Sequence, residues 1–113
     1  MANLKRANLQ EASLQGADLY GADLQEANLK GTNLKEANFE GANLKMTNLK
    51  EANLERADLE ESNFEGANLV EAYRLSFNQL SKVETLHNTK LDNELYIQLK
   101  EKFPALLENR VYR

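Results

Sequence analysis

The fold is decided by residues 2–71, which read ANLKR ANLQE ASLQG ADLYG ADLQE ANLKG TNLKE ANFEG ANLKM TNLKE ANLER ADLEE SNFEG ANLVE. This stretch repeats with a period of five, fourteen times in succession, as Ala, then Asn or Asp, then Leu, then two variable residues. The first position departs from Ala only at Thr32, Thr47 and Ser62. The second departs from Asn or Asp only at Ser13, and the third departs from Leu only at Phe39 and Phe64. A short fixed period of this kind is the sequence signature of a repeat architecture.

A period of five fits neither an α-helix nor a flat strand. On an α-helix each step of five residues turns about 500°, so the leucines would scatter around the cylinder. On a flat strand successive leucines would alternate between the two faces. The period requires a chain that turns a corner once per pentad, so that four pentads close a square coil of twenty residues. The sequence therefore predicts a β-solenoid in which Leu and the Ala two places before it point inward.

The third residue of each pentad forms the predicted core. Successive coils stack at the strand spacing of about 4.8 Å, so residues twenty apart are expected to lie one above another in four columns. The Asn and Asp rows are expected to bond nearby backbone at the corners. The predicted core residues are Leu4, Leu9, Leu14, Leu19, Leu24, Leu29, Leu34, Phe39, Leu44, Leu49, Leu54, Leu59, Phe64 and Leu69.

These fourteen consecutive pentads resemble the pentapeptide-repeat family, whose consensus is A(D/N)LXX. The resemblance implies an all-β repeat fold, a right-handed quadrilateral β-helix of about 3.5 coils over residues 1–73. The remaining residues, 74–113, are expected to form a short α-helical C-terminal cap, as in many photosynthetic-bacterial members. The cap would pack on the last coil, so that the chain forms one structural domain.

The residues of this cap carry helical signals. Ser76 with Gln79 is a candidate capping box for a helix over Phe77, Leu80 and Val83. A loop is expected at residues 87–89. Beyond this loop, Asp92 is a candidate N-cap for a second helix, with Leu91 stapled onto Tyr96. Because the apolar spacing is helical and Pro104 interrupts it, the residues expected to face the last coil are Leu91, Leu95, Leu99 and Phe103.

Composition excludes several classes of protein. The chain has 113 residues, a net charge of −4, no cysteine and one histidine, His87. The absence of cysteine excludes disulfides and thiol catalysis, and the acidic balance argues against direct binding of nucleic acid. A lone histidine in a polar segment provides neither a nucleophile nor a metal site. We therefore expect no enzyme, no cofactor and no metal. No apolar run is long enough to span a membrane, and no signal peptide is evident, so cytoplasmic localisation is expected.

The outward residues of one side of the coil are acidic and include no base. This side, which carries Leu19, Phe39 and Leu59 inward, is called the acidic face. Two interpretations remain open: a solvated surface that keeps the protein soluble, or a docking strip for a basic protein partner. The acidic face consists of Asp18, Tyr20, Glu40, Asp58, Glu60 and Glu61.

The first coil has an uncovered edge in this interpretation, because the pentads begin at Ala2. An open β edge offers unpaired backbone groups to another chain. One hypothesis is therefore a homodimer, or pairing with another protein, through this N-terminal coil. The alternatives are that Met1 and local fraying suffice, or that the chain belonged to a longer product.

The function that this sequence favours is a non-catalytic scaffold that binds a protein partner. The alternative follows from the resemblance: some family members mimic B-form DNA and bind a type II topoisomerase (gyrase). Duplex DNA carries about one charge per 1.7 Å, whereas the solenoid predicted here would be only roughly 17 Å long. Its net negative charge also lies almost entirely on the acidic face, since the other three sides are nearly balanced, so the scaffold is favoured over the DNA mimic.

Overall fold

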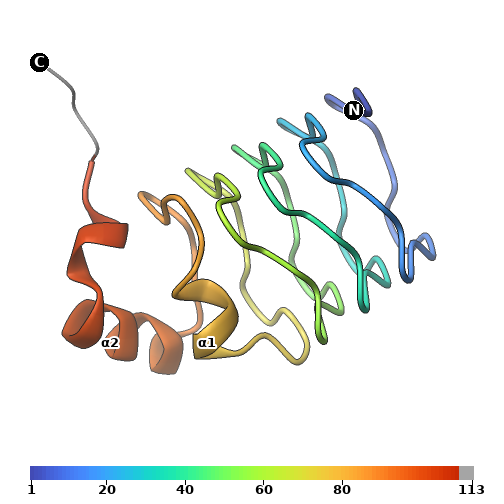
Figure 1. Ribbon diagram of the computed structural model, residues 1–113. Coiled ribbons are helices and arrows are strands. Elements are labelled where there is room, and N and C mark those ends of the chain that lie inside the picture. The colour runs from blue at the N-terminus through green and yellow to red at the C-terminus, as the bar shows by residue number, and fades with distance from the viewer. Residues whose placement is uncertain (110–113) are drawn as a thin grey trace, which may run out of the picture.

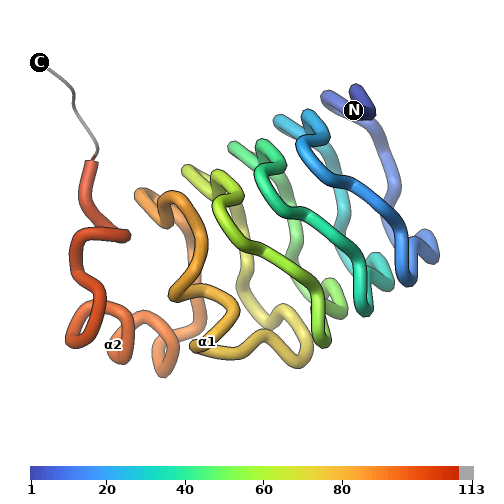
Figure 2. The backbone as a smooth tube through the Cα atoms, in the orientation of Figure 1, coloured from blue at the N-terminus to red at the C-terminus, as the bar shows by residue number. Residues whose placement is uncertain are grey.

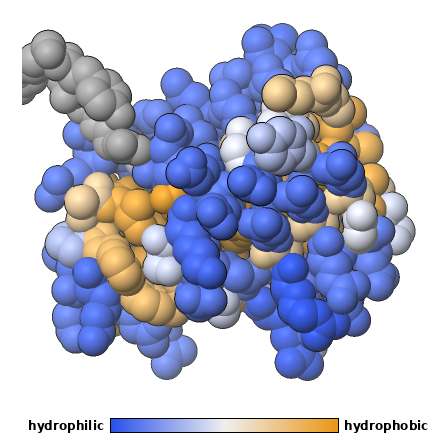
Figure 3. All heavy atoms as spheres, viewed as in Figure 1, coloured by the Kyte–Doolittle hydropathy of each residue, from blue (hydrophilic) through white to orange (hydrophobic). Residues whose placement is uncertain are grey.

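The computed structural model describes residues 1–109, which form a stack of square coils followed by short helices (Figure 1). The tube in Figure 2 follows the chain from its N-terminus, at one end of the stack, to the helices at the other end. On the side seen in Figure 3, the surface over the coils is largely hydrophilic, and apolar surface gathers near the two ends of the stack. Among the described residues, no helix has the length and apolar character needed to cross a bilayer.

Successive coils are joined by parallel bridges between residues twenty apart, from Asn3–Asp23 to Asn53–Tyr73. The second residue of each pentad makes both backbone bonds of a bridge. For example, the Asp23 N–H donates to the Ala2 carbonyl at 2.9 Å, and the Asp23 carbonyl accepts from the Leu4 N–H at 2.8 Å. Each bridge is one residue long because the chain turns at every pentad, so the described residues contain isolated bridges in place of extended strands.

Each corner is a tight turn, closed by a backbone hydrogen bond between one pentad and the next. The Ala7 N–H donates to the Leu4 carbonyl at 2.9 Å, and this bond recurs along the stack. The Asn3 side chain accepts from the Lys5 N–H at 3.2 Å, as the sequence predicts for the Asn rows. The last residue of the pentad is left-handed, with φ of +71° at Gly16 and +60° at Glu11, so the corner also tolerates non-glycine residues.

The third residues of the pentads point inward and form the core. From Leu24 onward each of these side chains is almost fully buried, whereas Leu4, Leu9 and Leu14 are half-buried because only one neighbouring coil covers them. The hydroxyl residues at Ala positions are also accommodated, since Thr47 Oγ1 donates to the Leu24 carbonyl at 2.8 Å. No buried side-chain nitrogen or oxygen lacks a partner within the described part of the chain.

The solenoid continues beyond residue 73, the end that the pentad pattern predicts. After the short helix α1 (Phe77–Leu80), the chain returns to the stack and forms bridges Asn63–Thr85 and Asn68–Lys90. Leu86 is fully buried at the core position. Thr89 Oγ1 donates to the Phe64 carbonyl at 2.6 Å, as threonines do elsewhere in the core. Residues 87–89 therefore form the expected loop, which is a turn of the last coil.

The helical elements are shorter than the sequence predicts. Helix α1 has the expected capping box, with the Gln79 N–H donating to Ser76 Oγ at 3.1 Å, but it ends before Val83 because the chain rejoins the stack there. Helix α2 spans Asn93–Lys102, and the 3-10 helix η1 spans Pro104–Leu107. Residues 110–113 of the expected cap lie outside the described residues.

Asp92 precedes α2 as predicted, but its side chain makes no capping bond. Its carboxylate accepts the Glu71 backbone N–H, with both oxygens at 3.1 Å. In the regular stack a backbone carbonyl of the next coil accepts this type of N–H, as Val70 does for Glu51. The Asp92 carboxylate thus takes the place of the backbone carbonyl that the next coil would supply. Because it is used there, it does not cap the N-terminus of α2.

The four predicted cap residues differ in burial. Leu99 is fully buried, Leu91 and Leu95 are half-buried, and Phe103 is exposed with its ring 5.7 Å from that of Phe77. Backbone groups close the last coil as well, because the Leu86 N–H donates to the Leu106 carbonyl at 2.7 Å. The helices therefore cover the C-terminal edge of the stack by hydrogen bonding as well as by apolar packing.

The Gln79 side chain supplies hydrogen bonds to the part of the third coil that no pentad of the next coil covers. Its Nε2 donates to the Leu54 carbonyl at 2.8 Å and to the Ala57 carbonyl at 2.9 Å. We expect Gln79→Leu to lower the free energy of unfolding by about 2–4 kcal/mol, because these carbonyls lose a donor. Chemical denaturation measures the loss. The control Asn78→Ala, at an exposed neighbour, should change stability by less than about 0.5 kcal/mol. Equal effects of the two changes would contradict this role.

Candidate functional site

The acidic face is an ordered row of side chains on one side of the stack. Asp18, Asn38 and Asp58 lie one above another, joined by bridges between successive coils. Each accepts a hydrogen bond from the backbone N–H two residues on: Tyr20 to Asp18 at 3.1 Å, and Glu60 to Asp58 at 3.0 Å. These turns hold the second residue of each corner in a fixed position. The rows of the acidic face are therefore spaced by the stacking of the coils.

The structure brings the six predicted residues of the acidic face to one side. Asp18, Tyr20, Asp58, Glu60 and Glu61 are exposed, and Glu40 is half-buried. Tyr20 is 51% exposed, although large apolar rings are usually more buried. The resulting surface is rigid, negatively charged and carries one aromatic ring, which is suited to binding a positively charged protein surface.

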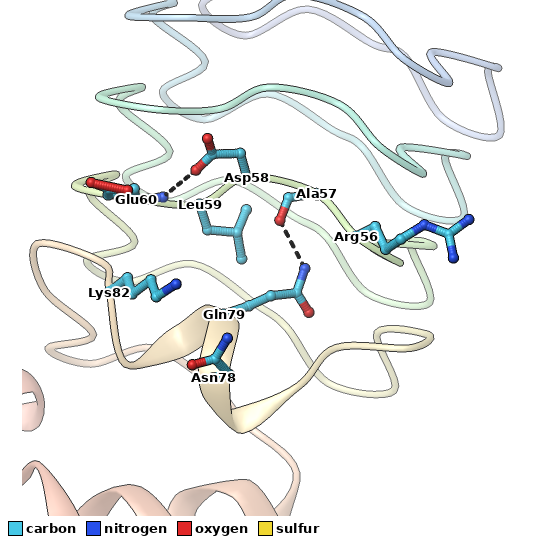
Figure 4. Close-up of a pocket in the computed structure, with 8 residues that line it drawn as sticks. All are labelled: Arg56, Ala57, Asp58, Leu59, Glu60, Asn78, Gln79 and Lys82. Atoms are coloured by element: carbon cyan, nitrogen blue, oxygen red, sulfur yellow. Dashed lines mark hydrogen bonds between the residues drawn. The ribbon is translucent and has the colours of Figure 1, made fainter.

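The end of the acidic face nearest α1 is lined by residues that the sequence pattern did not place there. An open hollow of about 350 Å³ separates the third coil from α1 (Figure 4). Lys82 reaches this place because the chain rejoins the stack there, with the Glu61 N–H donating to the Lys82 carbonyl at 2.8 Å. The sequence predicted no basic residue on this side of the stack. Lys82 corrects that prediction at the end of the acidic face nearest α1. The hollow is lined by backbone and side chains of Arg56, Ala57, Asp58, Leu59, Glu60, Asn78, Gln79 and Lys82.

Only one sequence signal pointed to this hollow, namely the break of the pentad lattice at Tyr73-Arg74. That break indicates where the chain leaves the stack, but it does not indicate where the chain returns. Arg56 is engaged at the edge of the hollow, with Nε 3.3 Å from Glu36 Oε2 and Nη1 3.4 Å from Glu55 Oε2. These exposed ion pairs contribute little to stability and leave the hollow a mixed-charge surface.

The single histidine of the chain makes contacts that hold the last coil together. His87 lies in the last coil, where its backbone N–H donates to Thr85 Oγ1 at 3.1 Å and its Nδ1 lies 3.3 Å from the Leu107 carbonyl. Its position thus links the coil to η1. Within residues 1–109, no cluster of three or more His, Cys, Asp or Glu side chains could hold a metal ion.

One carboxylate outside the acidic face has a shifted pKa. Hydrogen bonds from the Gln25 backbone and side chain, each 3.1 Å from Asp23 Oδ1, lower the pKa of Asp23. The backbone bond is the corner turn that every Asn or Asp in the second position makes. The shift is therefore explained by the repeat itself and does not indicate a catalytic group.

Comparison with solved structures finds other proteins of this architecture. The chain is similar to HetL, a pentapeptide repeat protein involved in heterocyst differentiation regulation from the cyanobacterium Nostoc sp. strain PCC 7120, with 38% identity, a TM-score of 0.69, and coverage of 80% of this chain and 39% of HetL. It is also similar to a pentapeptide repeat protein from the Arabidopsis thaliana thylakoid lumen, with 30% identity, a TM-score of 0.61, and coverage of 88% of this chain and 61% of that protein. The chain thus spans less than two thirds of the length of either.

A third solved structure shares the fold alone. It is QnrB1, a plasmid-mediated fluoroquinolone resistance protein, with 22% identity, a TM-score of 0.50, and coverage of 90% of this chain and 70% of that protein.

No curated protein sequence matches the chain significantly. These neighbours imply a right-handed quadrilateral β-helix, the fold that the family resemblance of the pentads also implies. The family model for pentapeptide repeats matches residues 2–41 and 37–73, which is more than half of the chain. The protein therefore belongs to the pentapeptide-repeat family.

Proposed function

We propose that this protein is a non-catalytic scaffold that presents its acidic face to a basic protein partner. The observation that carries the proposal is the fixed row Asp18–Asn38–Asp58, from which Tyr20, Glu40 and Glu60 project. A surface already ordered by the coil loses little conformational entropy when a partner binds. Carboxylates on one side of the stack also steer a cationic partner toward that side.

The proposal predicts that reversing the charge of the acidic face abolishes binding. The triple change Glu40→Lys, Glu60→Lys and Glu61→Lys replaces three negative charges with three positive ones, so a basic partner would meet repulsion. We expect a partner captured from host extract by the wild-type chain to be lost, by at least about tenfold, with this variant. Quantitative mass spectrometry of captured proteins at low salt measures the ratio.

A matched control separates the face from the total charge. Glu11→Lys, Glu51→Lys and Glu71→Lys make the same charge change at exposed positions of another face. The control should capture the same partner as the wild type. Capture that survives reversal of the acidic face, or that fails equally in both variants, would contradict the proposal. Circular dichroism of both variants establishes that each remains folded.

The alternative function is DNA mimicry toward a type II topoisomerase such as gyrase. The acidic face favours DNA mimicry, but Lys82 and Arg56, at the end of this face nearest α1, interrupt the negative surface. Purified gyrase distinguishes the two, because a mimic should inhibit supercoiling in a salt-sensitive way and lose this effect on charge reversal. We expect no inhibition. Direct nucleic-acid binding and membrane binding form no part of the proposal, and cytoplasmic localisation stays a prediction.

A further inference from the structure

The outer edge of the first coil carries a row of backbone groups without partners. In the second and third coils the second residue of each pentad directs both its N–H and its carbonyl to the coil before it, as Asp23 does toward Ala2 and Leu4. Within residues 1–109, no backbone bond is made by the corresponding groups of the first coil. Such an edge is a template for pairing with another chain. The four residues are Asn3, Asn8, Ser13 and Asp18.

We propose that this edge binds a second copy of the same chain, head to head, in a two-fold symmetric dimer. A two-fold axis perpendicular to the stack reverses the chain direction, so facing segments run antiparallel. In an antiparallel ladder, two residues that each point both backbone groups across the interface exchange two hydrogen bonds. The second residues of the pentads therefore face one another. This edge includes Asp18 and Tyr20 of the acidic face, whereas Glu40, Glu60 and Glu61 lie in later coils and take no part in the pairing. The inference therefore goes beyond the proposed function.

The slope of the coil determines which pentads meet. The edge of the first coil is a ramp that descends by one strand spacing, about 4.8 Å, over its four sides. The sloping edges of the two first coils have the same handedness. Their separation is therefore equal on all four sides only when the beginning of one coil lies opposite the end of the other. The first pentad of one copy then faces the fourth pentad of the other, and the second faces the third. Asn3 lies opposite Asp18 and Asn8 opposite Ser13, each pair occurring twice, with two bonds per pair.

This register also matches the inner side chains. The residue after each paired position is Leu, and the residue before it is Ala, so antiparallel pairing places Leu4 over Ala17 and Leu9 over Ala12 of the second copy. A large side chain thus meets a small one at every inner contact, which is the arrangement that fills a core. The half-buried leucines of the first coil would become covered, as their counterparts in later coils already are.

The outer side chains are compatible with the same register. Met1 is 94% exposed and Tyr20 is 51% exposed, and the register places each opposite the other across the interface. The Asn3 amide faces the Asp18 carboxylate, to which it donates. No pair of like charges stands directly opposite, since Arg6 meets Gln15 and Glu11 meets Gln10. Apolar exposure and charge therefore both favour a second copy as the occupant.

The test introduces one like-charge pair and then removes it. Asn3→Asp keeps the acceptor for the Lys5 N–H but places a carboxylate opposite Asp18 at both symmetric contacts. We expect the dimer dissociation constant to rise by roughly threefold to thirtyfold. Adding Asp18→Asn restores the original pairing with the two partners exchanged, and should restore the wild-type constant. Analytical ultracentrifugation of the full chain over a concentration series measures all three.

Asn43→Asp is the matched control, because it puts the same carboxylate on the same side, next to Asp23, but within the stack. It should leave the dissociation constant unchanged. A wild-type chain that stays monomeric up to millimolar concentration would overturn the proposal. So would a dimer that responds equally to Asn3→Asp and Asn43→Asp, or one that Asp18→Asn does not restore. None of these results bears on partner capture by Glu40, Glu60 and Glu61, so the two proposals fail separately.

Discussion

Leu49→Asp is expected to abolish cooperative unfolding of the protein. Leu49 is fully buried, with Leu29 in the coil before it and Leu69 in the coil after it. The change removes an apolar side chain worth about 2 kcal/mol and places a carboxylate where no cation or donor is available to it. An unpaired buried charge costs several kcal/mol more, which is comparable to the whole stability of a small domain. Thermal melting followed by circular dichroism measures the outcome.

Lys50→Asp is the control for this change, because it introduces aspartate at the adjacent residue, which is half-buried and belongs to the outward part of the pentad. This variant should melt cooperatively, within a few degrees of the wild type. A cooperative melt for Leu49→Asp at the wild-type temperature would mean that the third residue of the pentad does not line the core.

Removal of residues 76–113 is expected to cause aggregation or unfolding. The deletion takes away the last coil, so that Phe64 and Leu69 lose the residues stacked beneath them. It also strips partners from backbone groups, since the Phe64 N–H bonds the Thr85 carbonyl and the Leu69 N–H bonds the Lys90 carbonyl. Exposed apolar surface beside an open β edge promotes association. Size-exclusion chromatography with light scattering should show large particles or an unfolded chain.

A chain that ends at Glu108 is the control, because it keeps the carbonyls of Leu106 and Leu107 that contact the last coil. It should remain folded with a melting temperature close to that of the full chain. If residues 1–75 alone gave a compact species with a cooperative melt, the C-terminal segment would not be needed to close the stack.

The pentad lattice predicts most of the fold from sequence. Because the period is five and the inward residues are uniform, the position of a side chain such as Leu44 follows from its place in the pentad alone. The Asx-type bonds of the corners also follow, because Asn and Asp form them locally. The acidic face could be assembled for the same reason, since residues twenty apart must stack.

The last coil could not be predicted in the same way, because its pattern is degenerate and shifted by two residues. Thr85 and Lys90 replace Asn, and α1 is inserted before them. A signal was present, since Leu86 and Leu91 remain five apart and Thr89 precedes Leu91 by two, as Thr32 precedes Leu34. Lys82 and the hollow beside the acidic face depend on the path of this insertion, which tertiary packing determines.

The central claim is that the acidic face is the surface that contacts another protein. Photo-crosslinking tests it most directly, with a photoreactive amino acid at position 60 on the acidic face and, in a second variant, at position 46. Both Glu60 and Met46 are exposed, and they lie on different sides of the stack. We predict one discrete crosslinked protein from position 60, absent from position 46 and lost on reversal of Glu40 and Glu61. Equal crosslinking from both positions, or from position 46 alone, would contradict the claim.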